Sequence, residues 1–483
     1  MKAQLIAAVL MAGVLAMPPL SANAAEVPVS APVGIESVER WSAVASSVLT
    51  PIAASSFEAE RALILQKTNE LRAANGLAPF RLNPALSEIA QDWSVQQARV
   101  SSMSHRPDFT AMYPAGWSRA GENVAAGYSP NTVTDAWAAS PGHRANMLSG
   151  NTDIGIGVAA SSTGRLFYTQ NFGRYSVAPP TPPGAVARIS GDDRFSTSAR
   201  VSAEAFPTGA RTVFIASGLN FPDALSAAAL AGAAGGPLLL VQATSVPPVI
   251  LAELRRLDPD RIVVAGGSGV VSDAVLATLR TITPSVTRVF GVDRYDTSRA
   301  LARHAYGTAG SPVVYVATGT GFADALAAGP AAASVNAPVV LVPGGASAVD
   351  AATLTLLRQL GTTRVVIVGG VGVVSEGIRL SFVGAGYTVH RIAGEDRYST
   401  AALIANAHFS NAERSYIATG SGFADALSGG AAAGALGAPL FTSLAHCVPG
   451  STYSALITQS PGQLLLLGGL GALKPAVAGF YRC

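Results

Sequence analysis

Acidic and basic side chains recur at matched positions along the C-terminal two-thirds of the chain. An Asp recurs inside a Phe-x-Asp-Ala-Leu segment, at Asp223, Asp324 and Asp425. An Asp-Arg pair recurs just before an aromatic residue, as Asp193-Arg194, Asp293-Arg294 and Asp396-Arg397. Carboxylate and guanidinium groups can pair with each other or hold the charged groups of a ligand. Neither segment sets a nucleophile beside a general base, so the pattern predicts binding and not catalysis.

Each of these charges also has a structural explanation. An Asp in the first turn of a helix interacts favourably with the helix dipole and with free N–H groups, which contributes about 0.3–1 kcal/mol. An Arg that follows an Asp can form a salt bridge between neighbouring repeats. For Arg194, Arg294 and Arg397 the sequence slightly favours this inter-repeat salt bridge over direct ligand contact, and both alternatives stay open.

The charged segments are landmarks of one unit that occurs three times. Each copy carries the Gly-x-Asp-Arg segment, the Phe-x-Asp-Ala-Leu segment, an apolar run that begins with Pro, and a Gly-Gly-x-Gly loop. A period of about 100 residues is too long for a thin solenoid and matches a small domain. Short apolar runs alternate with helical segments, which predicts α/β units with parallel sheets covered on both faces. We expect the repeats at 187–285, 286–387 and 388–483.

The Gly-Gly-x-Gly loops each follow a predicted strand and precede a predicted helix. They lack the third glycine of a dinucleotide-binding fingerprint, and no acidic residue follows about twenty positions later. The loops therefore predict tight turns with close helix-to-strand packing. A helix N-terminus at such a loop can also hold an anion.

The N-terminal residues are typical of a secretory signal. Lys2 precedes an apolar segment at 3–17, and Ala22-Asn23-Ala24 supplies a small-x-small cleavage pattern. We expect a signal peptide at 1–24 and a tether rich in Ala, Val, Pro and Ser at 25–56. The chain is therefore expected to be secreted.

Neither a membrane anchor nor nucleic-acid binding is expected. The apolar stretch 224–241 is interrupted by Gly and Pro and recurs in every repeat, so it fits a buried helix and strand better than a membrane span. No lipidation Cys follows the signal, and no sortase-type signal is visible near the C-terminus. The net charge is only +3 and the chain has no Lys/Arg run.

The chain contains two cysteines, Cys447 and Cys483. An even number in an exported chain predicts one disulfide, and two free buried thiols are the alternative. Such a disulfide would tie down the C-terminal end of the chain.

The landmarks of residues 187–483 resemble those of the cell-wall-binding repeat 2 family. The resemblance rests on Gly-x-Asp-Arg-Tyr-x-Thr, Phe-Ala-Asp-Ala-Leu and Gly-Gly-x-Gly-Val-Val-Ser segments in three ordered copies. It implies three α/β parallel-sheet repeats in a pseudo-threefold arrangement. It also implies non-covalent binding of an anionic cell-wall polymer at the Gram-positive envelope. The third copy departs from the pattern, because residues 472–475 replace the Val-Val-Ser segment.

Residues 57–176 read as an α+β domain, with a helix at 86–100 and a pair of alternating strands at 154–158 and 166–172. The domain resembles the CAP superfamily (cysteine-rich secretory, antigen 5, pathogenesis-related 1) in a cysteine-free bacterial form. The residues that carry the resemblance are 69–72, Ser104, His105, 121–125, Trp137, 140–148 and 154–157. The resemblance implies an α-β-α sandwich with an open cleft. A Pro-rich, extended linker is expected at 177–186.

The resemblance also implies a cleft with two His and two acidic residues, which can bind a divalent metal in some family members. His105, Glu122 and His143 match three of these positions, and the fourth falls on Ser140. Two imidazoles and one carboxylate can ligate zinc or another divalent metal and leave a position open for water. The structural alternative is a helix cap at His143 and a hydrogen-bonded carboxylate at Glu122.

Two functions remain after these observations. In the first, the chain is a secreted cell-wall protein whose repeats bind the wall and display a CAP domain of unknown ligand. In the second, the CAP domain is a metal-dependent hydrolase tethered to the wall. Residues 57–176 show no Ser-His-Asp or Cys-His arrangement, and the fourth acidic ligand is missing. The sequence therefore favours the binding protein and does not predict an enzyme.

Overall fold

The computed structural model describes residues 57–483. The predicted signal peptide at 1–24 and the predicted tether at 25–56 lie outside the described residues. Among the residues described, no helix is both long and apolar enough to cross a membrane.

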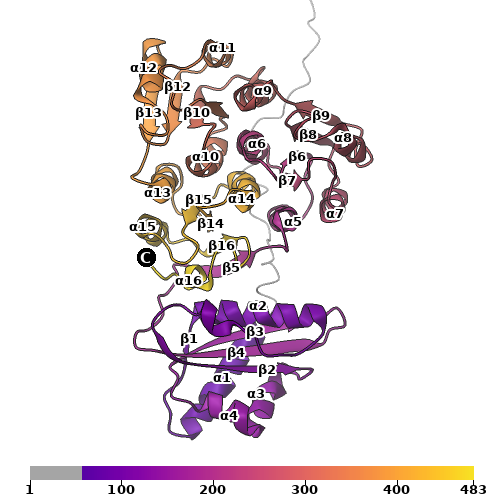
Figure 1. Cartoon of the computed structure of the whole chain (residues 1–483), viewed down its shortest axis with the longest axis vertical. Helices are drawn as coiled ribbons and strands as arrows, with labels where there is room; N and C mark the ends of the chain where they lie inside the picture. Colours follow the sequence, from indigo (N-terminus) through magenta and orange to yellow (C-terminus); the bar gives the residue numbers. More distant parts are fainter. Residues whose placement is uncertain (1–56) are drawn as a thin grey trace, which may run out of the picture. The chain divides into compact units, whose positions relative to one another are not determined.

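The N-terminal domain is a three-layer sandwich built on a four-stranded sheet (Figure 1). The strands are ordered β1-β3-β4-β2 and span Arg81–Leu82 (β1), Trp117–Ala126 (β2), Asp153–Ala160 (β3) and Leu166–Tyr175 (β4). Strand β4 pairs antiparallel with β2 and β3, whereas β1 pairs parallel with β3. One face carries α2 (Pro84–Val100), and the other carries α1 (Glu58–Ala74), α3 (Pro130–Ala139) and α4 (Pro141–Met147). The short helix η2 spans Phe109–Met112. This confirms the α-β-α sandwich that the resemblance implied.

Two glycines of β3 let α2 approach the sheet closely. A Cβ atom at Gly155 would overlap the backbone of Leu86, and one at Gly157 would overlap the backbone of Ala90. The start of α2 is fixed by Asn83, whose side-chain oxygen accepts hydrogen bonds from two backbone N–H groups of the first turn. The sheet and α2 therefore pack backbone against backbone at the centre of the domain.

Each repeat contributes strands and helices in the same order. The first contains α5 (Arg194–Ala205), β6 (Thr212–Ser217), α6 (Pro222–Ala233), β7 (Leu238–Val241), α7 (Pro248–Leu257), β8 (Arg261–Ala265) and α8 (Asp273–Leu279). The second contains β9 (Val286–Val289), α9 (Arg294–Tyr306), β10 (Val313–Thr318), α10 (Ala323–Ser334), β11 (Val339–Val342), α11 (Ala351–Gln359), β12 (Arg364–Val368) and α12 (Glu376–Gly384). The third contains β13 (Thr388–Ile392), α13 (Arg397–His408), β14 (Arg414–Thr419), α14 (Ala424–Ala435), β15 (Leu440–Ser443), α15 (Gly450–Gln459), β16 (Gln463–Leu467) and α16 (Pro475–Ala478).

The sheet of each repeat is completed by a strand that precedes the first helix of another repeat. The three sheets are ordered β7-β6-β8-β9, β11-β10-β12-β13 and β15-β14-β16-β5, and all neighbours are parallel. Strand β5 (Ala185–Ile189) stands just before the first repeat, yet it pairs with β16 of the third. The beginning of the repeat module is therefore joined to its end.

Helices α6, α10 and α14 lie at the centre of the three repeats and contact one another (Figure 1). Small residues allow this approach, because a Cβ atom at Gly232 would lie 3.1 Å from both the Ala333 Cβ and the Gly434 Cα. Most residues of the three helices are buried, and one continuous apolar core runs through all three repeats. This is the pseudo-threefold arrangement that the resemblance implied.

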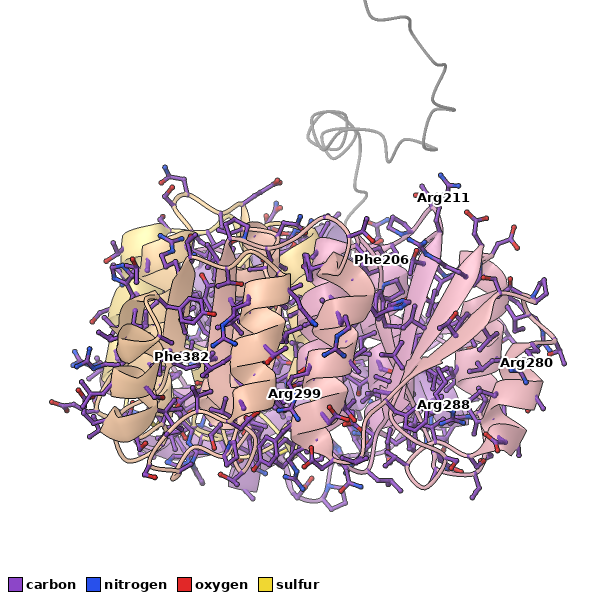
Figure 2. All side chains as sticks on the ribbon, turned by 90° about the horizontal axis from the view of Figure 1, so that it is seen from above. Phe206, Arg211, Arg280, Arg288, Arg299 and Phe382 are labelled. Carbon is purple, nitrogen blue, oxygen red and sulfur yellow. A yellow bond between two sulfur atoms is a disulfide. The ribbon has the colours of Figure 1, made fainter. Side chains whose placement is uncertain are left out.

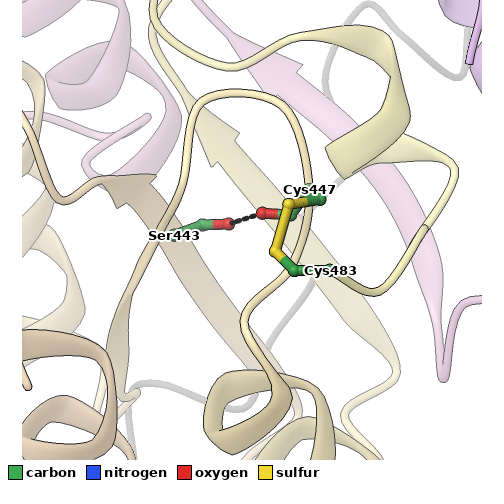
Figure 3. Close-up of a disulfide and its surroundings, with 3 residues drawn as sticks. All are labelled: Ser443, Cys447 and Cys483. Atoms are coloured by element: carbon green, nitrogen blue, oxygen red, sulfur yellow. Dashed lines mark hydrogen bonds between the residues drawn. A yellow bond between two sulfur atoms is a disulfide. The ribbon is translucent and has the colours of Figure 1, made fainter.

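A disulfide joins Cys447 to Cys483, as predicted (Figure 3). Their Cα atoms are 5.2 Å apart, and the hydroxyl of Ser443 donates a hydrogen bond to the Cys447 carbonyl oxygen at 3.1 Å. The backbone N–H of Cys483 also donates to the carbonyl oxygen of Val448 at 3.1 Å. The last residues of the chain are therefore held against the third repeat.

The third repeat keeps the backbone geometry of the others where its sequence departs. The backbone N–H of Lys474 donates to the carbonyl oxygen of Ala445 at 2.6 Å. The matched residues Ser272 and Ser375 make the same hydrogen bond in their own repeats at 2.8 Å. The change at residues 472–475 therefore alters side chains and leaves the turn intact.

Candidate functional site

Three phenylalanine rings meet where the central helices begin. Phe221, Phe322 and Phe423 directly precede α6, α10 and α14, and their ring centroids are 5.5–5.7 Å apart. Each central helix follows a strand of a parallel sheet, so the rings lie at the end of the module where those strands terminate. Open α/β sheets bind their ligands at this end. The Phe at the head of each Phe-x-Asp-Ala-Leu segment is the sequence signal for this cluster, although it was not among the predicted site residues.

Each Asp on a central helix faces the next repeat. Asp223 meets Thr297 and Arg294, Asp324 meets Arg397 and Thr400, and Asp425 meets Arg194 and Thr197. Burial raises the pKa of all three carboxyls, and the neighbouring hydroxyl and guanidinium groups oppose that shift. The structure thus brings the predicted Asp and Arg residues together at three boundaries. We call these the first junction (repeats one and two), the second (two and three) and the third (three and one).

The three arginines are also bonded within their own repeats. The Nη1 atoms of Arg194, Arg294 and Arg397 donate to the carbonyl oxygens of Gly218, Gly319 and Gly420 at 2.6, 2.7 and 2.5 Å, respectively. The charge of each Arg therefore acts across its junction while its hydrogen bond stays within its repeat. All three residues are exposed, so the same guanidinium groups are accessible to a ligand.

The backbone of each Gly-Gly-x-Gly loop lies close to the Asp carboxylate of a central helix. Gly266, Gly369 and Gly468 adopt φ values of +113°, +106° and +95°, which L side chains rarely adopt. A Cβ atom at Gly266 would lie 2.8 Å from Asp223 Oδ2, and one at Gly369 would lie 2.7 Å from Asp324 Oδ2. The predicted tight turns are present, and they require glycine for two reasons, the backbone angle and the nearby carboxylate.

The other three predicted acidic residues cap helices. The side chains of Asp193, Asp293 and Asp396 accept hydrogen bonds from the backbone N–H groups of Ser196, Asp296 and Ser399 at 2.7, 2.8 and 2.7 Å, respectively. Burial raises the pKa of Asp193, but the hydrogen bonds from Ser196 and Phe195 and the charge of Arg194 together outweigh burial and lower it. Each carboxylate fixes the start of the helix whose first residue is the junction arginine. The geometry therefore supports a positioning role for these three residues.

In the N-terminal domain, His105 contacts Glu122 directly. The Nδ1 atom of His105 lies 2.8 Å from Glu122 Oε1, which also accepts a hydrogen bond from the backbone N–H of Arg106 at 2.9 Å. Burial raises the pKa of Glu122, and the hydrogen bonds from Arg106 and His105 oppose that shift. The second oxygen of Glu122, Oε2, is buried and has no hydrogen-bond partner. A buried carboxylate with one unpaired oxygen therefore lies beside an exposed imidazole.

His143 lies on α4, near enough for His105 to affect its titration. Burial and then the charge of His105 lower the pKa of His143. The side-chain amide of Asn123 donates to the His143 carbonyl oxygen at 3.1 Å, which ties α4 to β2. Ser140, at the fourth cleft position, directly precedes α4 and carries a hydroxyl in place of a carboxylate.

These residues do not form a three-ligand metal site. Within residues 57–483, no group of three or more His, Cys, Asp or Glu side chains is placed to hold a metal ion. Oε1 of Glu122 is engaged with Nδ1 of His105 and its Oε2 is buried, so the accessible donors are the two imidazoles. The donor set fits weak metal binding better than a closed zinc site. Zinc binding by His105, Glu122 and His143 stays a prediction.

Asn171 is a buried polar residue beside Glu122 that was not predicted. It stands directly opposite Glu122 in the pairing of β2 with β4, so the two side chains share one face of the sheet. Asn171 is fully buried, and neither its Nδ2 nor its Oδ1 atom has a hydrogen-bond partner. Buried polar atoms are normally paired. Glu122 and Asn171 therefore form a polar floor with unused hydrogen-bonding capacity.

Comparison with known proteins places both parts of the chain. The sequence matches the profile of Cell wall binding domain 2 (CWB2) at 188–276, 288–379 and 391–478, and that of the Cysteine-rich secretory protein family (CAP) at 65–172. The N-acetylmuramoyl-L-alanine amidase LytC of Bacillus subtilis (strain 168) is 27% identical over 245 residues, which cover 51% of this chain and 47% of LytC. The chain spans about half the length of the curated relatives it matches, or less.

Solved structures show the same fold. Cwp8 from Clostridium difficile matches with a TM-score of 0.59 and 21% identity, over 84% of this chain and 68% of Cwp8. Cwp6 from Clostridium difficile matches with a TM-score of 0.57 and 23% identity, over 63% of this chain and 50% of Cwp6. Because the three CWB2 matches together cover more than half of the sequence, the chain belongs to the CWB2 cell-wall-binding family, and it carries a CAP domain ahead of its three repeats.

Proposed function

We propose that the three repeats bind an anionic cell-wall polymer non-covalently, and that the exported chain thereby displays its CAP domain at the wall. The observation that carries the proposal is the exposed guanidinium group at each junction, on Arg194, Arg294 and Arg397. Guanidinium groups suit the phosphate or carboxylate groups of such a polymer. Three equivalent sites on one module also suit a ligand whose charges repeat, because each bound site raises the effective concentration at the next.

Sedimentation of the full chain with purified Gram-positive cell walls tests this proposal. Binding should fall as salt rises, because salt screens the attraction between exposed charges. The triple change Arg194→Gln, Arg294→Gln and Arg397→Gln should weaken binding, whereas Arg280→Gln serves as a control. Arg280 is an exposed residue just beyond the end of α8 and lies outside the landmark segments (Figure 2). Equal binding by the triple variant and the wild type would contradict the proposal.

For the CAP domain we propose a ligand-binding cleft over the polar floor of Glu122 and Asn171. The alternative, a metal-dependent hydrolase, draws support from the raised pKa of Glu122, because a buried carboxyl suits proton transfer near neutral pH. Within residues 57–483, no group of three His, Cys, Asp or Glu side chains is placed to hold the metal of such a hydrolase. Incubation of the full chain with purified walls, with and without chelator, separates the two: release of wall fragments only without chelator would support the hydrolase.

A further inference from the structure

Phe290 gives the first junction a side chain that the other two lack. It directly precedes Gly291 of the Gly-x-Asp-Arg segment, and the residues at the matched positions are Ser190 and Ala393. The side chain is 55% exposed. Its ring lies against the glycine loop, since a Cβ atom at Gly267 would be 3.5 Å from it. The first junction alone therefore presents an aromatic ring at this position.

The first junction also lacks a carboxylate that the other two carry. Val292 is 95% exposed and stands where the third and second junctions have Asp192 and Glu395. A polyanion thus meets no carboxylate at this position of the first junction, whereas it meets Glu395 at the second and Asp192, which pairs with Arg99 at 2.8 Å, at the third.

A groove of about 340 Å³ extends from Phe290 between β9 and α9. Arg288, which is labelled in Figure 2, extends from β9. It is one of the residues that line the groove. Its guanidinium group is committed to the protein, because it donates to the carbonyl oxygens of Gly266 and Val271 and pairs with Asp273 at 2.9 Å. Arg288 therefore shapes the groove, and the accessible charge must come from α9.

Helix α9 supplies that charge through Arg303, which is exposed and lines the groove beside His304. Burial and the charge of Arg261 lower the pKa of His304, so this ring stays neutral to a lower pH than an ordinary imidazole. No carboxylate is among the groove's lining residues. The groove thus combines an aromatic ring with an uncompensated cationic wall.

We propose that the first junction is the polymer's preferred site, where Phe290 stacks on a sugar ring and Arg303 holds an anionic group of the same polymer segment. The C–H face of a sugar covers an aromatic ring, and a guanidinium group bonds phosphate or carboxylate oxygens. Charge complementarity and the lost carboxylate select an anionic glycan over an apolar partner. This inference rests on the proposed wall-binding function and makes Phe290 the specificity-determining residue of that function.

Sedimentation of the full chain with purified Gram-positive walls again supplies the measurement. Phe290→Ala should weaken binding about three- to tenfold, the range expected for one lost stacking contact. Phe290→Trp should retain binding, and Ala393→Phe should strengthen it by creating a second platform. Val371→Ala is the matched control, because Val371 is a 65% exposed apolar residue in the glycine loop of the second junction. Unchanged thermal unfolding of each variant shows that the fold is kept.

The outcomes separate this inference from the function on which it rests. Wild-type chain that fails to sediment overturns both. If the wild-type chain sediments and Phe290→Ala binds equally well, the preferred site alone is overturned. The same holds if Val371→Ala loses as much binding as Phe290→Ala. A further arm uses walls treated with hydrofluoric acid, which cleaves phosphodiesters and leaves uronic acids. Binding that survives the treatment assigns the anionic groups to carboxylates, and binding that disappears assigns them to phosphodiesters. Either result supports the preferred site only if Phe290→Ala also weakens binding to the untreated walls.

Discussion

Arg294 of the second repeat lies close to Asp223 of the first. Burial raises the pKa of Asp223, and the positive charge of Arg294 opposes that rise. The same arrangement recurs between Arg397 and Asp324 and between Arg194 and Asp425. In each case burial is the larger effect, so the folded state holds an ionised carboxylate at a net cost. Side chains kept in unfavourable surroundings are typical of functional sites.

Replacing Asp223, Asp324 and Asp425 together by Asn should raise stability at neutral pH. A carboxyl whose pKa is raised by folding holds its proton more tightly in the folded state than in the unfolded state. The ionised groups therefore destabilise the fold above the raised pKa values, and this penalty disappears as pH falls through them. The gain in Tm should be several degrees at pH 7 and should shrink toward pH of about 3.5. A gain of equal size at both pH values would contradict the burial argument.

Gly266→Ala should destabilise the first junction by about 1–3 kcal/mol, because the new Cβ atom meets Asp223 and the backbone angle is strained. Gly269→Ala is the matched control in the same loop, since a Cβ atom there has nothing within 4 Å. Urea unfolding of the two variants measures the difference. Equal losses would mean that neither the contact with the carboxylate nor the backbone angle at Gly266 has a measurable cost.

The strand–helix alternation and the glycine turns could be predicted because they depend on local residue types and spacing. The pairing of β5 with β16 could not, because hydrophobic periodicity identifies strands but not which distant strands are neighbours. The sequence predicted a contact between repeats for the recurring Arg. It could not identify the Asp of the Phe-x-Asp-Ala-Leu segment as the facing residue, because spacing within one repeat does not show which side chains meet across a boundary. The position of Asn171 beside Glu122 could not be predicted for a related reason, since only the register of β2 with β4 places the two residues opposite each other.

The double change Cys447→Ser and Cys483→Ser should lower the free energy of unfolding. A cross-link that closes a loop of 36 residues contributes about 3–4 kcal/mol in the loop-entropy description. Dithiothreitol should therefore lower the Tm of the wild type and leave that of the double variant unchanged. Mass analysis after alkylation should detect no free thiol in exported protein, and two alkylated cysteines would contradict the disulfide.

The full chain should take up zinc weakly, through the two imidazoles of the CAP cleft. Burial and the charge of His105 lower the pKa of His143, so this ring stays neutral to a lower pH than an ordinary imidazole and is available as a ligand at pH 7. Affinity should fall as pH drops through about 6.5 and below, where imidazoles gain protons. Calorimetry at several pH values measures the uptake. If no zinc is taken up at neutral pH, His105 and Glu122 form a hydrogen-bonded structural pair and not a metal site.

Substitutions locate the zinc on the cleft. The double change His105→Ala and His143→Ala should abolish uptake, whereas His390→Ala, at an exposed position on β13, should leave it unchanged. Glu122→Gln should weaken uptake about tenfold, because Glu122 orients the ring of His105 through their 2.8 Å contact. None of these changes should affect sedimentation with walls, since anchoring is assigned to the repeats. Uptake that survives the double change would place the metal elsewhere, and loss of sedimentation would mean that the CAP domain itself takes part in holding the wall.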